Sequence, residues 1–118
     1  MKASEIIYTP HKTGETIFKE NSGVSFITFP ALEAFPELTA AVSTREGGVS
    51  TGFFSSMNLG QMDKDERGKV LENYNIFCSA IGISPESLVL SDQKHTDNIR
   101  ITGRADCGKG IISEKDYE

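Results

Sequence analysis

The stretch DKDERGKVLENYNIFCSAIG, residues 63–82, decides the fold. Apolar residues recur in it at steps of three and four, which predicts an amphipathic helix with one face against a core. The pattern stops at Gly82, because glycine commonly ends helices. Asp63, with Glu66 three residues later, predicts a capping box at the start, and Asp65 is the competing cap. The apolar stripe consists of Val70, Tyr74, Phe77, Cys78 and Ile81.

Strand-forming residues precede this helix. Residues 16–19 predict a short strand and residues 24–29, VSFITF, predict a longer one. Residues 31–35 predict a single helical turn. Residues 38–44 predict a further strand, which delivers Arg45 to a loop at its carboxyl end.

A second group of elements is expected after the helix. Ser84 followed by Pro85 predicts a short helical turn. Residues 88–95 and 99–102 predict two strands joined by a turn into a hairpin. Strands on both sides of one helix indicate an α+β domain. Because the last strand has no neighbour, we expect an incomplete domain whose open edge promotes self-association.

Composition restricts the classes of function. A chain of 118 residues, 37% of them hydrophobic, fits one domain over residues 1–118. Twelve basic against 17 acidic residues give a net charge of −5, which argues against a nucleic-acid or anionic-membrane surface. No signal peptide or membrane-length apolar run is visible, so we expect a cytoplasmic protein. Cys78 and Cys107 are too far apart for a Cys-x-x-Cys motif and are expected to be reduced thiols.

Three short stretches carry the candidate chemistry: STREGGVS at residues 43–50, FFSSMNLG at residues 53–60 and QKH at residues 93–95. An arginine, paired glycines and side-chain amides are typical of pockets for anionic or polar ligands. Each residue also has a simpler interpretation, since an arginine or histidine is often just solvated and an asparagine often forms a turn. The candidates are Ser43, Arg45, Gly47, Gly48, Asn58, Gln93 and His95.

The ordered set of motifs resembles the YfiH-like laccase-domain family over residues 26–110. Members carry Ser-x-Arg-x-Gly-Gly-Val-Ser, then Ser-Leu-Asn-Leu-Gly, then Gln-x-His, and Met57 replaces the usual leucine here. The resemblance implies an α+β domain with a mixed β-sheet and packed helices, of which this chain is the amino-terminal part. It also implies one Zn²⁺ or Cu²⁺ ion bound by two histidines and a cysteine. His95 matches the first ligand, and the other two would lie outside this chain.

Cys107 lies in an Ala-Asp-Cys triplet like the one that carries the family's cysteine ligand. Here Gly108, Lys109 and Gly110 follow it, whereas proline and aliphatic residues follow in the family. The segment is more similar to the Asp-x-Gly-Lys-Gly stretch that some members carry after the histidine hairpin. Cys107 is therefore not assigned as a ligand.

Family members are described as purine nucleoside phosphorylases, acting on adenosine, inosine and methylthioadenosine with some adenosine deamination. The resemblance thus implies a purine nucleoside and phosphate as partners. It implies catalytic roles for Arg45 and Asn58, a metal-binding role for His95, and substrate binding by Ser43, Arg45, Gly47, Gly48 and Gln93. The alternatives are a copper-dependent polyphenol oxidase, an enzyme that edits peptidoglycan precursors, and an inactive fragment or binding module that lacks two metal ligands.

Overall fold

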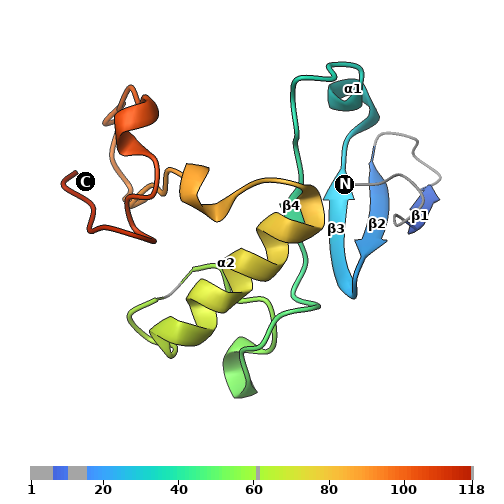
Figure 1. Cartoon of the computed structure of the whole chain (residues 1–118), viewed down its shortest axis with the longest axis horizontal. Helices are drawn as coiled ribbons and strands as arrows, with labels where there is room; N and C mark the ends of the chain where they lie inside the picture. The colour runs from blue at the N-terminus through green and yellow to red at the C-terminus, as the bar shows by residue number, and fades with distance from the viewer. Residues whose placement is uncertain (1–6, 11–15, 61, 118) are drawn as a thin grey trace. The chain divides into compact units, whose positions relative to one another are not determined.

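The structure is a computed structural model that describes residues 7–10, 16–60 and 62–117. The chain divides into two compact units, Met1–Gly82 and Ile83–Glu118. Each unit is built around different elements, since the first contains a sheet and the long helix and the second consists mainly of turns (Figure 1).

The first unit contains a four-stranded sheet in the order β1-β2-β3-β4, with every neighbouring pair antiparallel. Strands β2 and β3 form a hairpin in which Asn21 pairs with Val24. The two turn residues, Ser22 and Gly23, have φ values of 52° and 82°. Positive φ at both positions fits the right-handed twist of a two-residue hairpin and explains a glycine there. The strand bounds are Ile7–Pro10 (β1), Ile17–Asn21 (β2), Val24–Thr28 (β3) and Val42–Ser43 (β4).

Helix α2, Arg67–Ile81, packs against β3, and β2 and then β1 follow outward from β3 in Figure 1. The Phe77 ring meets the Phe26 ring edge-on at 6.5 Å between centroids. Gly82 has a φ of 80° and donates its N–H to the carbonyls of the last turn, as a glycine after a helix does. The predicted helix and its end are therefore confirmed. The buried apolar side chains are Val24, Phe26, Met57, Val70, Cys78, Ala80 and Ile81.

The predicted capping box at the start of α2 is wrong. The helix begins at Arg67, and its N-cap residue, Glu66, makes no side-chain capping bond. Asp65 instead accepts the Glu66 N–H through Oδ1, while its Oδ2 accepts hydrogen bonds from the preceding loop. The Asp65 carboxylate, which the sequence pattern offered as a helix cap, therefore mainly binds the preceding loop.

One expectation about the strands also needs correction. The strand predicted over residues 38–44 is only two residues long, because just Val42 and Ser43 pair with β3. The strand pairs within the described residues are all antiparallel, and the mixed sheet expected of the whole domain stays a prediction. The α+β class itself is confirmed.

The hairpin predicted over residues 88–102 does not form. Residues 88–102 contain no strand, and Ile99 and Ile101 are each 93% exposed. A two-stranded hairpin needs a third strand or a helix over its apolar face to be stable, and neither covers these isoleucines. The second unit is held instead by loop contacts, such as the Gly108 N–H to the Leu88 carbonyl at 2.7 Å.

The remaining helical segments are short. Both predicted single turns, after residue 30 and after Ser84, are confirmed. Within the part of the chain that the structure describes, no helix has the length and apolar character to cross a membrane. The segments are α1, Pro30–Glu33, and the 3₁₀ turns Gly52–Phe54, Pro85–Ser87 and Arg104–Asp106.

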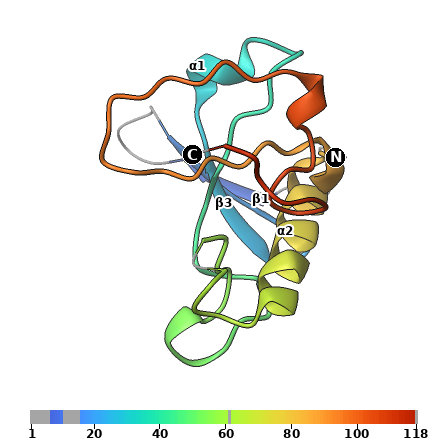
Figure 2. The same cartoon turned by 90° about the vertical axis from the view of Figure 1, so that its left-hand side faces the viewer.

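The loop between β4 and α2, residues 44–60, is named here the motif loop. It folds back along the amino-terminal half of α2 (Figure 2). Asn73 of α2, fully buried, accepts the Val49 N–H at 2.7 Å and donates to the Ser50 hydroxyl at 2.9 Å and the Asn58 carbonyl at 3.0 Å. One amide therefore joins two separate parts of the loop, residues 49–50 and residue 58, to the helix.

Gly48 lies where two segments of the motif loop, around residues 48 and 56, pack against each other. A Cβ at this position would come within 2.2 Å of the Ser56 carbonyl oxygen and 2.6 Å of the Asn73 Oδ1 atom. Both neighbours are fixed by hydrogen bonds, because Ser50 donates its N–H to the Ser56 carbonyl and Val49 donates to Asn73. Any side chain at residue 48 must displace backbone.

Replacing Gly48 by alanine is expected to lower the free energy of unfolding by at least about 2 kcal/mol, because the new methyl group overlaps packed backbone. The matched control is Gly68→Ala in α2, where a Cβ meets nothing within 4 Å. That change should raise the free energy of unfolding by about 0.5–1 kcal/mol through helix propensity. Urea unfolding followed by circular dichroism measures both. Equal stability of the two variants would contradict the close approach at Gly48.

Candidate functional site

Arg45 projects from the start of the motif loop and is exposed. Its Nε and Nη2 atoms both donate to the Ser55 carbonyl, at 3.0 and 2.9 Å. Its own carbonyl accepts the N–H groups of Ser56 and Met57. Among the described residues, none accepts a hydrogen bond from Nη1. The guanidinium is thus held in one orientation by one edge, while the other edge is open to an anion or a hydroxyl group.

The other candidates at the start of the loop have packing roles. Ser43, in β4, pairs with Phe26 of β3. Gly47 has a φ of 96°, and a Cβ there would come within 2.6 Å of the Gly23 carbonyl oxygen in the β2–β3 turn. Together with Gly48, it lets backbone pack on backbone. The substrate contacts expected of these residues stay predictions.

Asn58 has both ends of its amide engaged in hydrogen bonds, one to Asp65 and one to Gly60. Its Nδ2 donates to Asp65 Oδ2 at 3.1 Å, and its Oδ1 accepts the Gly60 N–H at 3.1 Å. The Ser50 hydroxyl donates to the same carboxylate oxygen at 2.6 Å. These hydrogen bonds, first from Ser50 and then from Asn58, lower the pKa of Asp65. Asn58 therefore orders the loop in this structure, and its catalytic role stays a prediction.

Gln93 and His95 lie in the second unit, on an exposed segment without regular secondary structure. Gln93 lines a hollow of about 460 Å³, whereas His95 is not among the lining residues. The motif loop and this segment belong to different units, so the structure groups Ser43, Arg45, Gly47, Gly48 and Asn58 in one unit and the Gln-x-His pair in the other.

A metal ion needs at least three protein ligands at a catalytic site. Within residues 7–10, 16–60 and 62–117, no group of three or more His, Cys, Asp or Glu side chains could hold one. The residues described here therefore do not fit the single-metal site by themselves, and His95 is one candidate ligand only. Cys107 is exposed, while Cys78 is buried in the core, where burial raises the pKa of its thiol. Cys78 thus has the core role that the helix pattern predicted.

The sequence patterns missed Asn73, Arg100 and Tyr117. Asn73 lies three residues after Val70 and four before Phe77, so it sits on the apolar face of α2. A polar residue on such a face was the available signal, since a buried amide must find hydrogen-bond partners. Arg100 and Tyr117 line the same hollow as Gln93 but come from distant segments, and no local pattern connects them.

Three bacterial relatives resemble part of the chain, and all are named purine nucleoside phosphorylases. The protein of Bacteroides thetaiotaomicron is 31% identical over 77 residues, which is 65% of this chain and 28% of the relative. That of Corynebacterium glutamicum is 35% identical over 63 residues, or 53% and 26% of the two chains. YlmD of Bacillus subtilis is 31% identical over 74 residues, or 63% and 27%.

The matched part of the chain is thus only about a quarter of the length of these relatives. The family described as multi-copper polyphenol oxidoreductase laccase matches residues 39–116. This range includes the motif loop and the Gln-x-His segment. Because the match extends over more than half of the sequence, the chain belongs to the multi-copper polyphenol oxidoreductase laccase family.

Proposed function

We propose that the full-length protein is a purine nucleoside phosphorylase and that the motif loop supplies its contact to phosphate or to the ribose. The observation that carries this proposal is the geometry of Arg45, whose guanidinium is fixed by the Ser55 carbonyl with one edge open. The names of the three relatives support the same activity. Adenosine, inosine and methylthioadenosine are the proposed substrates, and adenosine deamination is a proposed side activity.

Phosphorolysis makes specific demands on a protein. A phosphate oxygen attacks the anomeric carbon of the ribose, the bond to the purine nitrogen breaks, and the base leaves with the bonding electrons and gains a proton. The products are ribose 1-phosphate and the free base. A guanidinium held in advance can bind the phosphate through two parallel N–H groups without first losing conformational freedom. Arg45 meets this demand, because its orientation is set before any ligand arrives.

A single Zn²⁺ or Cu²⁺ ion belongs to this proposal, with His95 as one ligand. The family description names copper chemistry, and the two remaining ligands would lie outside this chain. Three protein ligands would leave one position for water or substrate, at which a metal acts as a Lewis acid.

Oxidation of phenols is the second candidate, since the family description itself names polyphenol oxidation. That reaction passes electrons from a phenol to oxygen through copper, and one ion at a site of this kind is a poor match for multi-electron transfer. The names of the relatives favour phosphorolysis. Assaying one preparation for hypoxanthine release from inosine and for oxygen uptake with a phenol separates the two activities.

Arg45→Ala in the full-length protein is expected to raise the KM for phosphate by about tenfold or more while leaving metal content unchanged. The change removes a charge-assisted contact, and such contacts are worth roughly 1.5–3 kcal/mol. Initial rates of hypoxanthine release from inosine at varied phosphate concentrations give the KM and kcat.

The matched control is Arg67→Ala, which removes a second exposed arginine of the same unit. The Arg67 side chain contacts the Met62 sulfur and has no part in the motif loop. Its KM for phosphate should equal that of the wild type. If both variants change the KM equally, or if neither does, Arg45 is not the anion contact.

The 118-residue chain alone is expected to bind Zn²⁺ only weakly, because one imidazole lacks the further ligands that make a tight site. Titration calorimetry should show no tight stoichiometric binding, and His95→Ala and Cys107→Ala should change little. Tight binding that Cys107→Ala abolishes would mean that this cysteine is a ligand after all.

We also propose that the isolated chain self-associates. Ile99 and Ile101 are almost fully exposed, and apolar side chains in that state favour association. Sedimentation velocity should show a mass that rises with concentration, and replacing both isoleucines by serine should restore a monomer. A monomeric wild type at all concentrations would contradict the proposal.

A further inference from the structure

The second unit contains a hollow of about 460 Å³ that no motif predicted. Its wall comes from residues 89–94, from the alternate residues 96, 98, 100 and 102, and from Tyr117. Small-molecule pockets usually measure about 300–1,000 Å³, so the size suits a nucleoside or a smaller ligand. Gln93 is the only residue of the predicted substrate set in this wall.

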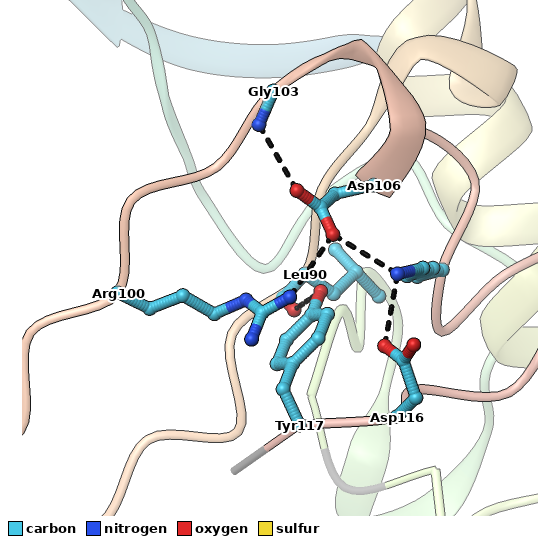
Figure 3. A network of polar contacts seen from close by, with 7 residues as sticks. Leu90, Arg100, Gly103, Asp106, Asp116 and Tyr117 are labelled. Atoms are coloured by element: carbon cyan, nitrogen blue, oxygen red, sulfur yellow. Dashed lines mark hydrogen bonds and ion pairs between the residues drawn. The ribbon is translucent and has the colours of Figure 1, made fainter.

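One side of the hollow is a stacked pair of side chains, Arg100 and Tyr117, shown in Figure 3. The Arg100 Cζ atom lies 4.0 Å from the centre of the Tyr117 ring. The tyrosine hydroxyl donates to the Leu90 carbonyl at 2.7 Å, which fixes the ring. The guanidinium therefore lies on a ring that cannot easily rotate away.

Asp106 fixes the guanidinium from another direction. Its side chain is only 11% exposed. The Oδ1 atom accepts one hydrogen bond from Arg100 Nη2 at 3.1 Å and another from Lys109 Nζ at 3.0 Å. Its Oδ2 accepts the Gly103 N–H at 3.0 Å. The Gly103 N–H, Lys109 and Arg100, in that order, lower the pKa of Asp106 far below its usual range, so the carboxylate is ionised at neutral pH.

The charges of this cluster cancel. Lys109 also pairs with Asp116 at 2.9 Å, so two cations, Arg100 and Lys109, face two carboxylates. An added phosphate would gain no net attraction from such a group, in contrast to the open edge of Arg45. What the group offers is a flat, delocalised cation, and planar aromatic ligands stack on guanidinium faces.

The rest of the wall suits the edges of a heterocycle. Gln93 and Asn98 each provide an amide that can donate and accept hydrogen bonds, and Thr96 and Thr102 provide hydroxyl groups. Sites that recognise planar bases combine such edge contacts with a stacking surface. Both kinds of group are present in this hollow.

We propose that the hollow binds the purine base of the substrate, with the base stacked on Arg100, and that Asp106 is the residue that positions Arg100 for this contact. The proposal rests on the proposed function only for the identity of the base. It adds Arg100 as a specificity residue and Asp106 as a positioning residue.

Binding of hypoxanthine to the 118-residue chain tests this directly, without any turnover. The sequence has four arginines, so their Nε–H signals can be resolved and assigned by NMR after isotope labelling. Hypoxanthine should shift the Arg100 signal in a saturable way, and inorganic phosphate alone should not. Arg100→Lys keeps the positive charge next to Asp106 but removes the planar guanidinium group. This change should weaken hypoxanthine binding about tenfold.

Two further variants test whether Asp106 positions the Arg100 guanidinium for base binding. Asp106→Asn should weaken binding similarly and move the Arg100 signal toward that of a free arginine before any ligand is added. Arg104→Lys, at an exposed arginine outside the hollow, should leave the affinity unchanged. Unchanged affinity in Arg100→Lys, or a shift caused by phosphate and not by hypoxanthine, would overturn the inference.

The outcome is independent of the proposed function. If hypoxanthine binds at Arg100 but inosine and phosphate are not converted, the proposed function fails and the base site stands. If the full-length protein performs phosphorolysis while Arg100→Lys binds hypoxanthine as well as the wild type, the base site fails and the proposed function stands.

Discussion

The buried amide of Asn73 is the interaction on which the described part of the candidate site most depends. It bridges Val49, Ser50 and Asn58 from inside the core, where water cannot replace a lost hydrogen bond. Asp65 extends this network, because its carboxylate accepts hydrogen bonds from the Ser50 and Asn58 side chains. A loop of small and polar residues, which could not hold one shape by apolar burial, is therefore fixed to α2.

This arrangement separates the residues that build the loop from the residue that can bind a ligand. The glycines, Asn58 and Asp65 satisfy or pack the backbone, whereas Arg45 keeps one edge of its guanidinium free. The sequence of the motif loop resembles that of a ligand pocket. In the structure most of its residues serve to hold one cation, Arg45, in place. The cluster around Asp106 works in the same way, since it holds the Arg100 guanidinium over the Tyr117 ring.

The elements that could be predicted are those whose signals are local. The apolar period of residues 70–81 and the glycine after it agree with the structure, and the strand predicted over residues 24–29 is present at Val24–Thr28. The strands expected at 38–44 and 88–102 failed for one reason, because a strand exists only where a partner pairs with it. Asn73 and Arg100 act through residues far away in the sequence, and the spacing of a motif carries no information about such contacts.

Amide hydrogen exchange at Val49 is the most direct test of the idea that α2 fixes the motif loop through Asn73. Among the described residues, the only partner of the Val49 N–H is the Asn73 side chain. Asn73→Ala should make this amide exchange at least about tenfold faster while amides in the middle of α2 stay protected, because a local opening replaces a buried hydrogen bond. Asn75→Ala, at an exposed position of the same helix, should leave exchange unchanged. Equal exchange at Val49 in the wild type and Asn73→Ala would show that the loop is held by something else.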